Sequence, residues 1–126
     1  MNSVDQAKPT RRRRHPDARL LKLAIAYFEA EQAHLRSIDV TDDAQRLRSL
    51  RGGEAAYAAA KVRRLKAYEI AEKAAARVLR TPATTLAGYR AKAKVADECL
   101  ADGEAYRRLL SEVLAWAEAQ GPEQIN

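Results

Sequence analysis

The fold is decided by residues 69–95, whose sequence is EIAEKAAARVLRTPATTLAGYRAKAKV. Residues 69–80 are rich in alanine and other good helix formers and contain neither glycine nor proline. Pro82 lacks a backbone N–H and disfavours helical backbone at the residue before it, so a helix should end there. Thr84 or Thr85 can then cap the next helix. The segment therefore predicts two helices joined by a short turn.

Two long helices are predicted upstream of this turn. The first covers residues 16–38, and residues 39–41 read as a connection in which Thr41 caps the second helix. The second runs to Arg80 and contains the pair Gly52–Gly53, which is costly in a helix interior. The glycines mark either a break in this helix or a close helix crossing.

The first helix has a recognisable start and an apolar face. Pro16 suits a first helical turn, and Asp17 places a carboxylate near the exposed N–H groups of that turn. Spacing typical of a helix predicts that one stripe packs on the core. Its members are Leu21, Ile25, Phe28 and Leu35, with Leu20, Ala24 and Tyr27 beside them.

Two shorter helices are predicted downstream. Asp102 and Gly103 separate them, and Gly121 and Pro122 end the second one. The third helix of the chain carries a heptad-like stripe of Leu86, Tyr89, Ala93, Ala96 and Leu100. The fourth presents Tyr106, Leu109, Leu110, Val113, Leu114 and Ala117.

These segments predict an all-α fold in 126 residues, the size of one domain. We expect an antiparallel bundle of about four helices with a long central helix, the first two helices antiparallel and the last two packed across them. The boundaries are a flexible basic arm at 1–15, a single helical domain at 16–121 and a short tail at 122–126. Alanine supplies much of the apolar content, so the core should be thin, and a homodimer would cover apolar stripes left over.

Positive charge is concentrated in the arm. The net charge of the chain is +6, and residues 1–16 supply +4 of it. The candidate binding residues are Lys8, Arg11, Arg12, Arg13 and Arg14. A disordered arm of this kind could contact nucleic-acid phosphates, bind an acidic protein surface, or remain a solvated tail.

No group of residues indicates catalysis, a metal site or a cofactor. His15 and His34 have no partner at a metal-ligand spacing, and Cys99 has no nearby histidine to make it a nucleophile. We therefore expect no enzyme activity and a buried or half-buried thiol. A lone cysteine fits a reducing cytoplasm, and no stretch approaches the roughly 20 apolar residues of a membrane span.

Residues 81–93, TPATTLAGYRAKA, resemble a stretch found in short helical proteins of alpha-proteobacterial genomes, often in prophage-like or other mobile regions. The resemblance covers residues 17–100 in layout and implies two helices before the turn and a lysine-bearing helix after it. It implies no catalytic residue or ligand. Gly88 within it permits a close backbone approach. This chain differs from the pattern of that group in its Gly52–Gly53 pair and its arginine run.

The sequence thus favours a non-enzymatic helical interaction protein, a regulator or accessory factor of a mobile element that acts through protein–protein contacts. The alternative is a nucleic-acid-associated protein that uses Arg11–Arg14 for phosphate contacts.

Overall fold

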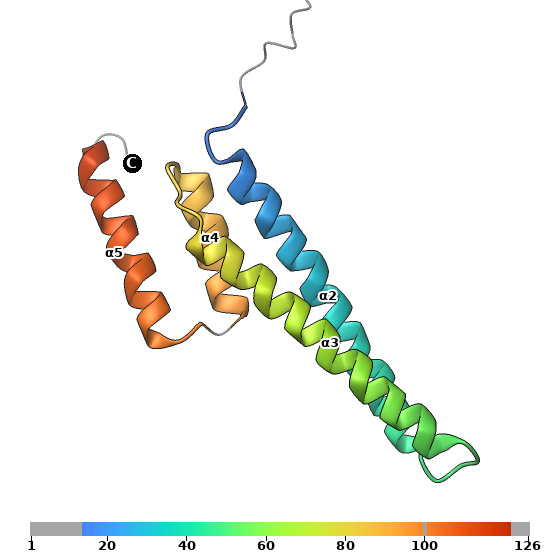
Figure 1. The fold of residues 1–126 in the computed structure, drawn as a ribbon. Helices are drawn as coiled ribbons and strands as arrows, with labels where there is room; N and C mark the ends of the chain where they lie inside the picture. Colours follow the sequence, from blue (N-terminus) through green and yellow to red (C-terminus); the bar gives the residue numbers. More distant parts are fainter. Residues whose placement is uncertain (1–13, 100, 122–126) are drawn as a thin grey trace, which may run out of the picture.

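A computed structural model describes residues 14–99 and 101–121 and consists of four α-helices, with no strand in these ranges (Figure 1). The helices are α2 (Ala18–Arg46), α3 (Gly53–Arg80), α4 (Leu86–Glu98) and α5 (Gly103–Gln120). The prediction of an all-α helical bundle is confirmed. Most of the predicted arm, the tail at 122–126 and Leu100 lie outside the described residues.

The helices form three layers (Figure 1). α2 and α3 make a long antiparallel hairpin, as predicted, and α4 packs against both of them. We expected the last two helices to lie across the hairpin, but α5 packs mainly against α4 instead. Because α4 has 13 residues and spans about 20 Å, it covers only one end of a hairpin about 42 Å long.

The predicted end of the first helix near residue 38 is wrong, because α2 continues to Arg46. Thr41 is a buried residue inside α2 and caps no helix. Its hydroxyl donates to the carbonyl oxygen of Ser37 at 2.7 Å and lies 3.3 Å from that of Ala60 on α3. Contact with α3 therefore keeps this segment helical, although its residue types also suit a turn.

The Gly52–Gly53 pair breaks the helix, which settles the two alternatives. Gly52 has a φ of +75°, a left-handed conformation that side chains rarely adopt. A Cβ atom on Gly53 would collide with the backbone carbonyls of Leu47 and Arg48. Both glycines are therefore needed for the tight turn between α2 and α3.

The buried face of α2 differs from the predicted stripe. The buried apolar residues are Leu20, Ala24 and Tyr27, which were expected beside the stripe. Ile25 is 59% exposed and Leu35 is also exposed. The two rows lie next to each other on the helix, and only the positions of α3 and α4 decide which row is covered. In α4 the buried residues include Lys92 and Val95, while Leu86 is exposed.

A buried carboxylate joins the starts of α2 and α4. Asp17 accepts hydrogen bonds from the backbone N–H groups of Thr84 and Thr85 at 3.0 Å each, and from their hydroxyls at 2.9 and 2.6 Å. Thr85 is the N-cap of α4, and its side chain accepts the N–H of Gly88. A Cβ on Gly88 would collide with the Asp17 carboxylate, so the group that approaches this glycine closely is a side chain and not the backbone that was expected.

These bonds also set the charge of Asp17. Burial disfavours the charged form, but the hydrogen bonds from Thr85 and Thr84 outweigh burial and lower the pKa of the carboxyl below 3.8. A lowered pKa adds stability that is present above the unfolded-state value and is lost as the pH falls through the folded-state value.

We predict that Asp17→Asn lowers the free energy of unfolding by about 2 kcal/mol at neutral pH, because an amide turns N–H donors toward the donors of Thr84 and Thr85. Urea unfolding at several pH values measures this. The difference between the wild type and the variant should shrink as the pH falls below about 4. A constant difference would contradict the assigned role of the carboxylate.

Candidate functional site

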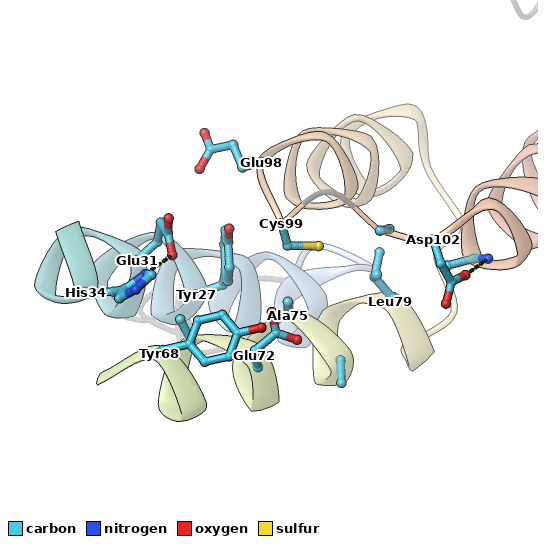
Figure 2. Close-up of a pocket in the computed structure, with 14 residues that line it drawn as sticks. Tyr27, Glu31, His34, Tyr68, Glu72, Ala75, Leu79, Glu98, Cys99 and Asp102 are labelled. Atoms are coloured by element: carbon cyan, nitrogen blue, oxygen red, sulfur yellow. Dashed lines mark hydrogen bonds and ion pairs between the residues drawn. The ribbon is translucent and has the colours of Figure 1, made fainter. Parts of the chain in front are cut away.

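A groove with a volume of about 610 Å³ lies where α2, α3, the end of α4 and the start of α5 come together (Figure 2). Each of these segments contributes one carboxylate to the lining. They are Glu31 on α2, Glu72 on α3, Glu98 at the end of α4 and Asp102 at the N-cap of α5. We call this site the acidic groove.

The acidic groove is strongly negative in a chain that carries a net positive charge. None of the described residues that line it is lysine or arginine. The one basic group is His34, whose Nδ1 lies 3.4 Å from Glu31 Oε1. The His34 ring also packs on Tyr68, with ring centroids 5.4 Å apart. The groove therefore combines excess negative charge with the contacting rings of His34 and Tyr68.

Tyr27 lies at the floor of the groove. Its side chain is only 1% exposed, and its hydroxyl has no hydrogen-bond partner among the described residues. Burial, followed by the charge of Glu31, raises the pKa of this hydroxyl well above its usual value. Figure 2 shows the hydroxyl pointing toward the end of α4 that carries Glu98 and Cys99. Tyr27 thus offers an unused polar group to the groove.

Cys99 lines the same groove but has a weakly reactive thiol. Its side chain is partly buried, as expected from the sequence, and Sγ lies 3.8 Å from the carbonyl oxygen of Ala96. Burial and the charge of Glu72 raise the pKa of the thiol. Because the thiolate is the nucleophile, a raised pKa disfavours covalent chemistry at this position.

Polar contacts hold α5 in position beside the groove. The ammonium of Lys92, which is fully buried in α4, lies 2.8 Å from a carboxylate oxygen of Glu112 on α5. Tyr106 donates to the carbonyl oxygen of Ala96 at 3.0 Å, and the indole of Trp116 donates to that of Thr84, also at 3.0 Å. Asp102 caps α5 by accepting the N–H of Ala105.

Of the binding residues predicted from the sequence, only Arg14 is among the described residues, and it does not line this groove. Lys8, Arg11, Arg12 and Arg13 lie outside the described residues. Arg14 is exposed and, with His15, lies against Ala18, Leu21 and Ile25 of α2. Ile25 and Tyr27 are two residues apart, so this surface and the groove are about 200° apart around the helix.

The sequence did not reveal the acidic groove. Its carboxylates are 26 or more residues apart, except for Glu98 and Asp102, and each could equally lie on a solvated helix face. Among the described residues, no three His, Cys, Asp or Glu side chains are grouped closely enough to hold a metal ion.

Comparisons with protein-family models, curated proteins and solved structures gave no match for this chain. None of the described helices is both long and apolar enough to cross a membrane.

We predict that Tyr27→Phe raises the free energy of unfolding by about 1 kcal/mol, because it removes a buried hydroxyl that makes no hydrogen bond. Tyr106→Phe is the matched control, and it should lower stability by a similar amount because it breaks the bond to Ala96. Denaturant unfolding checks both variants. Loss of stability in Tyr27→Phe would show that this hydroxyl has a partner in solution.

Proposed function

We propose that this chain is a non-enzymatic interaction protein that binds a partner protein through its helical surface. The observation that carries the proposal is the placement of apolar side chains. Among the described residues, six of the twelve buried hydrophobic residues are alanine, whereas thirteen large hydrophobic side chains are exposed. Where such exposed side chains form a contiguous patch, the patch is typical of a protein–protein interaction site.

Three of these exposed side chains form a continuous face on α5. Tyr106, Leu110 and Leu114 follow one another every four residues and are exposed, Leu110 and Leu114 by 59% and 58%. Leu109, Val113 and Trp116 belong to the core or pack against it. α5 therefore has one face in contact with the bundle and a second apolar face free to bind an amphipathic helix.

The far end of the hairpin supports the same proposal. Figure 1 shows α2 and α3 extending well beyond α4. In this part the buried residues are the small Thr41, Gly53 and Ala60. Leu35 on α2 and Leu65 on α3 are exposed, and the contacts His34–Tyr68 and Thr41–Ala60 show that they lie at a similar height along the two antiparallel helices.

We place this activity in the cytoplasm, because a single cysteine suits a reducing compartment. The resemblance of residues 81–93 to helical proteins of mobile genetic regions favours a regulator or accessory factor of such an element. A second copy of the chain is one candidate partner, since a homodimer would cover the same apolar face.

We predict that Leu110→Lys/Leu114→Lys abolishes capture of the partner from the native host while changing the free energy of unfolding by no more than about 0.5 kcal/mol, because both residues are largely exposed. Ser111→Lys/Ala119→Lys is the control, with the same charge change at exposed positions elsewhere on α5. Affinity capture with tagged wild type and both variants tests this. Equal capture by all three proteins would contradict a role for the apolar face.

A second candidate function is favoured by the run Arg11–Arg14, which with Lys8 supplies five positive charges in seven positions. Such a segment can bind the phosphates of a nucleic acid without reading its sequence.

For this candidate we predict a gel shift with duplex DNA or RNA at low salt that weakens steeply when the salt concentration is raised fourfold, because bound phosphates release counterions. Replacing Arg11–Arg14 with alanine should abolish the shift. Absence of a shift at low salt, or a shift that persists in the alanine variant, would exclude this role of the arginine run.

A further inference from the structure

The acidic groove gathers more negative charge than its own residues balance, although Glu31 lies beside His34 and Asp102 accepts the N–H of Ala105. Four carboxylates from four segments face a space of about 610 Å³ without a lysine or arginine among its described lining residues. Elsewhere in the chain, carboxylates do have such partners, as in the pairs Glu112–Lys92 and Glu104–Arg108. Like charges gathered in one concave site repel one another and attract a cation.

Tyr27 supplies an independent observation. Its hydroxyl is buried, unpartnered and directed toward the carboxylate-bearing end of α4 (Figure 2). Leaving a buried hydroxyl without a hydrogen bond is costly, so native proteins rarely do so without a reason. A ligand with N–H groups would satisfy the Tyr27 oxygen as an acceptor and the surrounding carboxylates as counter-charges.

We propose that the acidic groove binds an organic cation, namely the guanidinium or ammonium group of an arginine, a lysine or a polyamine. The carboxylates pair with the cation, and the Tyr27 oxygen accepts one of its N–H groups. The rings of Tyr68 and His34 line the site, and the face of Tyr68 can add a cation–π contact. This site is separate from the apolar face of α5 and does not depend on it.

The cation could come from a second copy of this chain or from another molecule. The chain itself contains the run Arg11–Arg14. Arg14 lies on the far side of α2 from the groove, which disfavours contact between the run and the groove of the same copy. The run of a second copy has no such restriction. Both sources present the same chemistry, and the experiment below separates them.

The test is calorimetric titration of the full chain with two probes. One is agmatine, which carries a guanidinium and an amine, and the other is an acetylated and amidated peptide of residues 7–15, AKPTRRRRH. The groove variant is Glu72→Gln/Glu98→Gln. The control variant is Glu54→Gln/Glu118→Gln, which changes the net charge equally at exposed positions outside the groove. Circular dichroism verifies that both variants stay helical.

We expect the groove variant to bind both probes at least about tenfold more weakly than the wild type, and the control variant to bind them within about twofold of it. Tyr27→Phe should weaken binding about threefold or more while leaving the fold intact, because it removes only the acceptor oxygen. No binding to the wild type, or equal weakening in the groove and control variants, would overturn the proposal.

Sedimentation of the wild type identifies the source of the cation. If a second copy supplies it, the wild type self-associates at low salt, and both the groove variant and the Arg11–Arg14→Ala variant remain monomeric. If another molecule supplies it, the wild type remains monomeric while still binding the probes. Self-association that survives in the groove variant, together with unchanged probe binding, would contradict the proposed site.

Discussion

The rest of the structure depends on one interaction, in which the Asp17 carboxylate accepts the backbone N–H groups of Thr84 and Thr85. It joins residues 67 and 68 positions apart and fixes the start of α4 against the start of α2. A carboxylate that accepts several N–H and O–H groups is stable when buried, whereas an unpaired one is not. Gly88 is part of this arrangement, because a side chain there would occupy the position of the carboxylate.

The position of the acidic groove is a consequence of this contact between α2 and α4. Once α4 is fixed at one end of the hairpin, its 13 residues carry Glu98 and Cys99 to the middle of α2 and α3. The chain then turns at Asp102, and the Lys92–Glu112 pair holds α5 against α4. The groove thus forms at the place where α4 stops and the hairpin continues. Its acidic character comes from Glu31 and Glu72 on the hairpin together with Glu98 at the end of α4 and Asp102 at the N-cap of α5.

Features set by local chemistry could be predicted from the sequence. The stop at Pro82, the cap at Thr84 or Thr85 and the Asp102–Gly103 boundary depend on neighbouring residues alone, and each lies close to where it was expected.

Features set by packing could not be predicted. Thr41 looks like a cap in sequence but lies inside a helix because Ala60 approaches it, and Leu20 and Ala24 are buried where Ile25 was expected. The groove depends on four distant segments, so no local pattern could reveal it.

The distribution of side chains bears directly on the proposed binding function. Alanine-rich interfaces let helices approach closely and leave the larger leucines and valines outside, where they add little to the stability of the isolated chain. Charge is also uneven in two places, the run Arg11–Arg14 and the four carboxylates that line the groove. Apolar surface exposed to water promotes aggregation, and clustered like charges repel one another. Both costs are relieved when a partner covers the surface, which is the physical argument for the proposed association.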